Sequence, residues 1–332
     1  MCFFKNRILA PRKISKMDKI PSVDLRDFLS DNPERKQKFV NEIGKAYEEI
    51  GFVALKGHFL DDKLVDDLYG EVKNFFELPT ETKLKYEIPG IGGQRGYVGF
   101  GKETAKGFKK GDLKEFWHFG QYVSDDSKYK SEYPDNVIVE ELPKLNEIGK
   151  ETYQMLEKTG KYVLRALALY LDLDEFYFDE KIAEGNSILR PIHYPPITEE
   201  PDDAVRAAAH GDINLITLLM GSQGKGLQVQ NHKGEWIDAI AEPDELMINV
   251  GDMLSRHTNN KLKSTIHRVV NPPRELWGTS RYSIPFFMHP VSEMSLNALE
   301  NCVDENHPKL YEDTTAGEFL RERLIELGLI KI

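Results

Sequence analysis

With 332 residues, 40% of them hydrophobic and 30% charged, the chain is long enough to bury a sizeable core. No apolar run approaches the ~20 residues that a membrane-spanning helix needs, which argues against a membrane partner. The net charge of −11 argues against nonspecific nucleic-acid binding, because that binding depends on neutralising phosphates. Only Cys2 and Cys302 are present, so we expect no disulfide framework and a cytoplasmic, reducing location.

The first sixteen residues differ from the rest of the chain. They contain five basic side chains and no acidic one: Lys5, Arg7, Arg12, Lys13 and Lys16. A short targeting segment is one interpretation of this composition. We favour another, in which residues 1–16 are a dispensable, disordered extension and the regular sequence begins at Met17.

Residues 17–140 form the next region, which we predict to mix helices and strands. Apolar alternation over 20–25 indicates a strand. Pro33 opens a helix with helical apolar spacing that Gly51 closes. A buried strand over 52–55 and a second helix starting at Asp61 follow. We expect these helices to support a sheet.

A glycine-rich loop spans residues 89–111. No Gly-Lys-Ser/Thr follows it and no strand-then-helix context surrounds it, so we reject a phosphate-binding loop. We expect a mobile loop that faces a ligand. Four residues in or just after it are candidates to line a substrate pocket: Arg95, Tyr97, Trp117 and His118. The alternative is a surface arginine and ordinary packing aromatics.

The second half changes from helix to short strands. An apolar stripe over 142–173 predicts a long buttressing helix within a region spanning 141–183. Turn signals separate several short strands within residues 184–292, which favours an antiparallel sandwich or barrel. An amphipathic helix over 314–329 lies in a C-terminal helical region, 293–332. We expect strands over 188–194, 215–220, 226–230, 236–240, 246–250, 265–271 and 282–288.

Two histidines and one aspartate give the chain its strongest chemical signal. His210 and Asp212 are two positions apart, so on a strand both side chains point the same way. His267 follows 55 positions after Asp212, within residues that predict another strand. Two imidazoles and one carboxylate with open positions are the ligands of a non-haem Fe(II) site that activates dioxygen.

A cationic strand follows this motif by fourteen positions. Alternation over 281–286 places Arg281 and Ser283 on one face, and Tyr282, Ile284 and Phe286 on the other. Such a strand packs its apolar face on the protein body and presents the arginine to a polar pocket. A carboxylate-bearing co-substrate needs a cation of this kind.

Zinc is the competing metal, since a zinc hydrolase can also use two histidines and a carboxylate. It would need a nearby general base, and the chain has no His-Glu-x-x-His helix. Among the other histidines, His257 is the one rival ligand. We expect the rest to be surface, loop or packing residues.

The run over 188–290 resembles the isopenicillin N synthase-like branch of the Fe(II)/2-oxoglutarate-dependent oxygenases. The matching elements include Tyr194-Pro195-Pro196, the His-x-Asp pair, Asn249-Val250-Gly251-Asp252, His267-Arg268-Val269-Val270-Asn271-Pro272 and Arg281-Tyr282-Ser283. The resemblance extends to residues 20–25 and 51–53, so it covers most of the chain. It implies a mainly β fold with flanking helices around a double-stranded β-helix, a cupin-like jelly-roll core.

The resemblance also implies the cofactors. Fe(II) would be bound by His210, Asp212 and His267, with O2 and 2-oxoglutarate at the open positions. The distal carboxylate of 2-oxoglutarate would pair with Arg281 and accept a further hydrogen bond from Ser283. Tyr194 matches a family position that contacts the co-substrate. Ile192 departs from the family pattern, in which an asparagine often stands there.

Three functions are compatible with these residues. The first is a dioxygenase that hydroxylates or desaturates a small molecule while 2-oxoglutarate is decarboxylated to succinate. The second keeps the iron without 2-oxoglutarate, as in oxidases and cyclases of the isopenicillin N synthase type, which also contain the Arg-x-Ser pair. The third is a non-catalytic ligand sensor, although mere binding does not need an open iron site. The substrate and the oligomeric state do not follow from the sequence.

Overall fold

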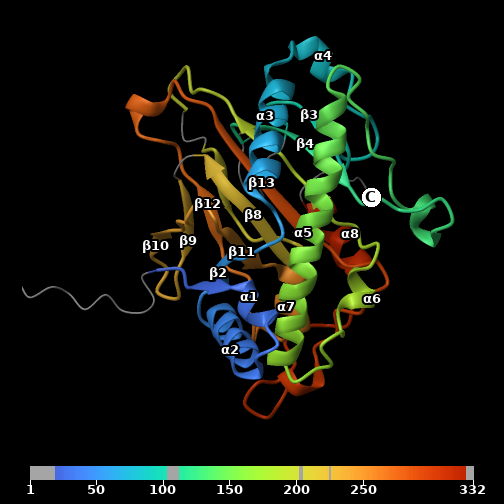
Figure 1. Ribbon diagram of the computed structural model, residues 1–332, viewed down its shortest axis with the longest axis vertical. Coiled ribbons are helices and arrows are strands. Elements are labelled where there is room, and N and C mark those ends of the chain that lie inside the picture. The colour runs from blue at the N-terminus through green and yellow to red at the C-terminus, as the bar shows by residue number, and fades with distance from the viewer. Residues whose placement is uncertain (1–18, 103–111, 202–204, 224–225, 327–332) are drawn as a thin grey trace, which may run out of the picture.

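The computed structural model describes residues 19–102, 112–201, 205–223 and 226–326. The predicted extension over 1–16 and part of the glycine-rich loop therefore lie outside the described residues. Two sheets pack against each other, with helices covering the larger one (Figure 1). This arrangement confirms the mainly β fold with flanking helices and is consistent with the predicted jelly-roll core.

The larger sheet has nine strands and combines both halves of the chain. Its order is β1-β2-β11-β8-β13-β5-β4-β3, and β6 pairs with both β13 and β4. The strands are β1 (Ser22–Asp24), β2 (Phe52–Lys56), β3 (Gly96–Val98), β4 (Glu115–Gly120), β5 (Ile188–Leu189), β6 (Ile192–Tyr194), β8 (Ile216–Gln223), β11 (Leu246–Val250) and β13 (Arg281–Met288).

The smaller sheet has the order β10-β9-β12-β7, which leaves β7 at an edge. Its strands are β7 (Ala207–His210), β9 (Leu227–Gln230), β10 (Trp236–Asp238) and β12 (His267–Val269). The inner faces of the two sheets meet where Phe52 and Met247 of the larger sheet pack with Val229 of the smaller one. The Phe52 ring also lies 5.6 Å from the His267 ring.

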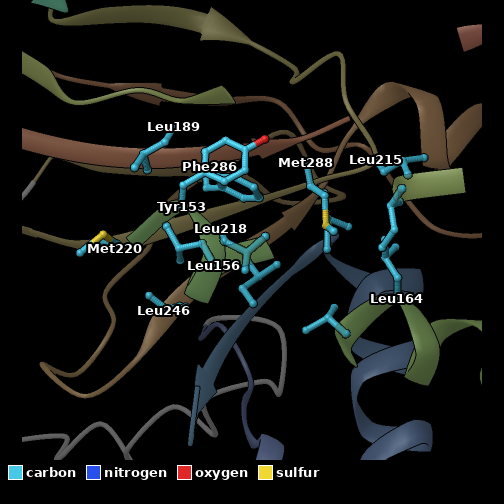
Figure 2. Packing of buried hydrophobic residues seen from close by; sticks show 14 of the residues in the cluster. Tyr153, Leu156, Leu164, Leu189, Leu215, Leu218, Met220, Leu246, Phe286 and Met288 are labelled. Carbon is cyan, nitrogen blue, oxygen red and sulfur yellow. The ribbon is translucent and has the colours of Figure 1, made fainter. Parts of the chain in front are cut away.

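The outer face of the larger sheet is covered by α5 (Pro143–Tyr170), with α3 (Asp62–Glu77) beside it (Figure 1). Figure 2 shows Tyr153 and Leu156 of α5 packed over Phe286 and Leu218. The Tyr153 and Phe286 rings meet edge to face at 4.9 Å. One hydrophobic cluster contains side chains from Val23 to Phe319, so the helices and the sheet share a single core.

Local sequence explains where the helices begin. Asn32 caps α2 (Pro33–Glu49) by accepting a hydrogen bond from the Glu34 amide at 2.9 Å. Pro33 suits the first turn because an amide hydrogen there would have no partner within the helix. Asp61 caps α3 through the Leu64 amide at 2.7 Å. The remaining helical segments are α1 (Leu25–Phe28), α4 (Thr80–Leu84), η1 (Lys128–Ser131), α6 (Asp179–Ile182), α7 (Asp252–His257), η2 (Arg274–Leu276), η3 (Glu300–Cys302) and α8 (Ala316–Glu326).

The structure corrects several predicted elements. The strand expected over 188–194 is divided into β5 and β6, because Pro191 has no amide hydrogen to continue the ladder. β3 and β4 were not predicted at all. The strand expected over 265–271 is only three residues long, and the end of the C-terminal helix expected over 314–329 lies outside the described residues.

Candidate metal centre and co-substrate pocket

Three side chains that the sequence singled out converge between the two sheets. His210 ends β7, His267 begins β12, and the two residues are direct cross-strand partners with ring centroids 4.5 Å apart. Oδ1 of Asp212 lies 3.9 Å from Nε2 of His210 and 3.8 Å from Nε2 of His267. Two ligands that are each ~2.1 Å from one ion lie at most about 4.2 Å apart, so this spacing suits a divalent metal.

The backbone determines which nitrogen each imidazole presents to this centre. Nδ1 of His210 lies 2.7 Å from the Ala208 carbonyl, and Nδ1 of His267 lies 3.1 Å from the Thr265 carbonyl. A carbonyl only accepts, so each Nδ1 donates and each Nε2 keeps its lone pair for a metal. Loss of hydration against the surrounding protein, and then the neighbouring His267, lower the pKa of His210 to about 4. The His210 ring is therefore neutral at pH 7.

Asp212 is oriented so that one oxygen faces the imidazoles. Its other oxygen, Oδ2, accepts hydrogen bonds from Thr217 Oγ1 at 2.6 Å and from Asn249 Nδ2 at 2.8 Å. Burial by itself would raise the pKa of Asp212. The two histidines and these hydrogen bonds outweigh burial and lower that pKa. The carboxylate is therefore ionised, as a metal ligand must be.

The junction between β11 and α7 holds the backbone of Asp212 in place. The Asp252 amide donates to the Asp212 carbonyl at 2.7 Å. The Gly251 amide donates to the Leu215 carbonyl at 2.9 Å. A β-carbon on Gly251 would lie 2.1 Å from the Asn214 carbonyl oxygen, so only glycine permits this close approach of two backbone segments.

The metal end of the site is open on one side. The His210 side chain is 41% exposed, whereas the side chains of Asp212 and His267 are 5% and 10% exposed. Three protein ligands on one side of a six-coordinate ion leave three positions for other groups. The exposed side is therefore where a co-substrate and dioxygen can reach the metal.

Arg281 and Ser283 lie on the inner face of β13, as strand alternation predicted. Arg281 is opposite Tyr194 of β6, and its guanidinium carbon lies 5.0 Å from the centre of that ring. Arg281 is 2% exposed, yet its Nε and Nη1 have no hydrogen-bond partner. Buried donors without a partner beside the Ser283 hydroxyl fit the carboxylate of a bound 2-oxoglutarate.

Tyr97 and Trp117, two of the predicted pocket residues, lie on the helix side of the larger sheet. They are cross-strand partners on β3 and β4, and both are almost completely buried. The Trp117 ring packs 4.8 Å from Phe75 of α3, and the Tyr97 hydroxyl donates to Glu115 at 2.5 Å. These contacts correspond to the packing alternative rather than to a pocket wall.

His118 lies on the opposite face of β4 from Trp117. Nε of Arg190 donates to its Nε2 at 2.5 Å. The Arg190 guanidinium carbon lies 4.5 Å from the Phe116 ring and 5.0 Å from the Phe287 ring. Phe116 also clusters with Tyr194. His118 therefore belongs to an inner wall that continues to the residues around Arg281.

Arg95 is completely buried, in contrast to the surface position that was its alternative. Its Nη1 donates to the Gln94 carbonyl at 2.8 Å, while Nε and Nη2 have no partner. Burial lowers the pKa of this guanidinium. Its head group lies against Gly120, where a β-carbon would come within 1.7 Å.

His257, the rival ligand, makes its hydrogen bonds elsewhere. Its Nδ1 lies 2.7 Å from the Asn297 carbonyl, and its Nε2 lies 2.9 Å from the Tyr177 hydroxyl. Within the described part of the chain, one group of histidines and acids has the spacing for an ion: His210, Asp212 and His267.

Sequence reasoning missed the residues that support the site. Thr217 and Asn249 carry no periodic signal, although Asn249 lies in a run that resembled the family pattern. Arg206 is 3% exposed and lies beside Tyr194, with 5.9 Å from its guanidinium carbon to the ring centre. The sequence feature that could have drawn attention to Arg206 is its position directly before the small, apolar run Ala207-Ala208-Ala209.

Comparison with known families agrees with this geometry. The model for the N-terminal region of a non-haem dioxygenase in morphine synthesis matches residues 20–141. The model of the 2OG-Fe(II) oxygenase superfamily matches residues 185–290. Together they cover more than half of the chain, so the protein belongs to the 2OG-Fe(II) oxygenase superfamily.

Individual relatives are similar over nearly their whole length. The 2-oxoglutarate-dependent dioxygenase frbA of Dothideomycetidae sp. is 32% identical, covering 92% of this chain and 96% of the relative. A crystal structure of a 2OG-Fe(II) oxygenase family protein from Caulobacter crescentus is 43% identical. It covers 93% of this chain and 99% of its own, with a TM-score of 0.84. A full-length Neurospora crassa protein, solved in complex with alpha-KG, is 30% identical. The match covers 92% of this chain and 96% of that protein, with a TM-score of 0.80.

These comparisons confirm the class of enzyme predicted from the motifs. The protein is a non-haem dioxygenase that depends on Fe(II), O2 and 2-oxoglutarate. They favour this function over the oxidase that does not use 2-oxoglutarate and over the non-catalytic sensor. Among the described helices, none is both long and apolar enough to cross a membrane.

Proposed function

We propose that His210, Asp212 and His267 hold the Fe(II), and that Arg281, Ser283 and Tyr194 bind the distal end of 2-oxoglutarate. The observation that supports this assignment is the contrast between the two ends of the site. One end presents two imidazole nitrogens and a carboxylate oxygen to a shared centre. The other presents a buried guanidinium whose donors lack partners.

Iron with 2-oxoglutarate would supply the oxidising power: one substrate molecule, one O2 and one 2-oxoglutarate give CO2, succinate and either the hydroxylated substrate or the desaturated substrate plus water. The chain's residues orient the reactants. Backbone carbonyls orient both imidazoles, and hydrogen bonds from Thr217 and Asn249 orient Asp212.

The substrate is a small molecule that lies against the inner wall of His118, Arg190, Phe116 and Phe287. This wall combines two aromatic faces with a guanidinium and an imidazole. Such a wall suits a flat substrate with hydrogen-bond acceptors or a negative charge. The Neurospora crassa relative has also been solved in complex with thymine, a ligand of that flat, polar kind. A reducing cytoplasm, predicted from the two cysteines, suits the ferrous ion.

An anaerobic titration tests the assignment. Fe(II) is added to the purified protein, and 2-oxoglutarate is then added while the visible spectrum is recorded. A metal-to-ligand charge-transfer band is expected with 2-oxoglutarate and not with succinate, which cannot chelate through a keto acid. Iron binding without such a band, together with oxygen uptake on a candidate substrate alone, would favour the oxidase that does not use 2-oxoglutarate.

A further inference from the structure

A second buried arginine lies at the co-substrate end of the site. Arg206 immediately precedes β7, the strand that ends in His210, and only 3% of its surface is exposed. Its Nη2 donates to the carbonyl of Thr279 at 3.2 Å, two residues before Arg281. Arg206 therefore connects the start of β7 with the start of β13.

Arg206 and Arg281 approach the same aromatic ring. The guanidinium carbon of Arg206 lies 5.9 Å from the centre of the Tyr194 ring, and that of Arg281 lies 5.0 Å from it. Nε of Arg206 has no partner, and neither do Nε and Nη1 of Arg281. Three buried N–H-bearing nitrogens therefore remain unsatisfied around one tyrosine.

No acidic side chain among the described residues balances the charges of this pair. Burial lowers the pKa of Arg206, and the charge of Arg281 lowers it further. None of the ion pairs within the described residues includes either arginine. Two adjacent buried cations without an acid are unfavourable because each loses its hydration and repels the other. An anion between them would offset both costs.

We propose that Arg206 is a second cationic ligand for the distal carboxylate of 2-oxoglutarate, so that Arg281 and Arg206 bind this carboxylate together. The inference rests on the proposed function, because it places the co-substrate with its keto-acid end at the metal. The distal carboxylate has two oxygens, and each can accept from one guanidinium. The pair thereby selects a dicarboxylate over a 2-oxo acid that ends in a methyl group.

The test compares 2-oxoglutarate with 2-oxovalerate, which has the same keto-acid end but no distal carboxylate. Dissociation constants are measured anaerobically on the Fe(II) protein through the charge-transfer band, in the absence of substrate. The variants are Arg206→Gln and Arg206→Lys. The control is Arg268→Gln, which removes the same charge from the outer side of β12, where Arg268 bonds to Gln228 and stacks on Trp236.

We expect Arg206→Gln to weaken 2-oxoglutarate binding by about tenfold to a hundredfold, the usual effect of losing a charged hydrogen bond. Binding of 2-oxovalerate should change less than about twofold. Arg206→Lys should recover part of the affinity for 2-oxoglutarate, because it keeps the charge but not the planar fork. Arg268→Gln should leave both constants unchanged.

Other outcomes would overturn the inference. An equal loss for both ligands would mean that Arg206 supports the fold and does not recognise the carboxylate. Unchanged affinity for 2-oxoglutarate would refute only the role of Arg206, and the proposed function would stand. If wild-type protein gave no band with 2-oxoglutarate, both proposals would fail. Should Arg206→Gln not fold, the ratio of the two constants in Arg206→Lys decides: a ratio equal to that of the wild type refutes the inference.

Discussion

Buried charged side chains on the two faces of the larger sheet differ in whether the protein provides their hydrogen-bond partners. On the outer face, under α3, Glu115 accepts from Lys83 Nζ at 2.8 Å and from the Tyr97 hydroxyl. Its other oxygen lies 2.8 Å from Nδ1 of His193. On the inner face, Arg281 is equally buried but has donors without partners.

The difference indicates that the outer charges stabilise the fold, whereas the inner arginine binds a ligand. The outer network is complete: Nε2 of His193 also reaches the Ser280 hydroxyl at 3.0 Å, so it connects β4, β6 and the start of β13. A buried charge whose partners are all present stabilises the arrangement of strands. A buried charge without a protein partner has lost its hydration uncompensated, so a bound anion would offset that cost at Arg281. The following predictions test that distinction.

The largest effect is expected at the metal. His267→Ala removes one of the three converging ligands, so we expect no detectable iron-dependent turnover and no charge-transfer band with 2-oxoglutarate. The measurement is an anaerobic Fe(II) titration followed by a succinate assay. His307→Ala is the control, because His307 is exposed and pairs locally with Asp304. Normal turnover in His267→Ala would refute the ligand assignment.

The outer network should matter for stability. Glu115→Gln leaves Lys83 buried without a counter-charge, and we expect the free energy of unfolding to fall by about 3 kcal/mol. Urea unfolding of the iron-free protein measures this. The double variant Lys83→Met with Glu115→Gln should recover most of the loss, since it removes both charges together and keeps an amide oxygen as acceptor for the Tyr97 hydroxyl. A loss below about 1 kcal/mol for Glu115→Gln would contradict the structural role.

The inner arginine should show the reverse pattern. Arg281→Leu is expected to raise the apparent KM for 2-oxoglutarate by about tenfold to a hundredfold, since a charged hydrogen bond is lost. The free energy of unfolding should change by less than about 1 kcal/mol, because no protein partner is left unsatisfied. Steady-state kinetics and urea unfolding of the same preparation give both values. An unchanged KM would remove Arg281 from the co-substrate site.

The smallest effect is a pH dependence of the outer network. Burial alone would raise the pKa of Glu115, but hydrogen bonds from His193, Lys83 and Tyr97 outweigh it and lower that pKa below its usual 4.5. A carboxyl with a lowered folded-state pKa stabilises the fold above its unfolded pKa and loses that contribution as pH falls through the folded value.

We therefore expect the difference in unfolding free energy between wild type and Glu115→Gln to be constant from pH 7 to about 5.5. It should shrink below pH 4.5. A difference that grows on acidification would contradict the charge assignment. Unfolding in urea at a series of pH values measures it.

Much of this architecture follows from the sequence, because its patterns are local. The alternation along β13 correctly placed Tyr282, Ile284 and Phe286 in the core and Arg281 and Ser283 on the inner face. Caps and apolar spacing located α2, α3 and α5 to within a few residues. His210, Asp212 and His267 lie close together as predicted, but the strand argument holds only in part. β7 ends at His210, so Asp212 is not on the strand that the i, i+2 argument assumed.

Other features could not be predicted because they depend on tertiary context. Phe116-Trp117-His118-Phe119 is aromatic on both faces, so alternation cannot say which side faces the helices, and Trp117 was placed in a pocket. Arg206 lies in a bend, where neither strand nor helix periodicity applies. Its importance depends on Tyr194 and Thr279, which come from other segments of the chain.

The pairing of His210 with His267 has a mechanical consequence. β7 is an edge strand, held along one side by the three residues of β12, and a register shift interrupts even that short ladder. An ion bound by both imidazoles would crosslink this edge to its neighbour. Iron loading would then protect the backbone amides of β7 from hydrogen exchange. The exchange rates of these amides would therefore report how much of the protein holds iron, even before any turnover occurs.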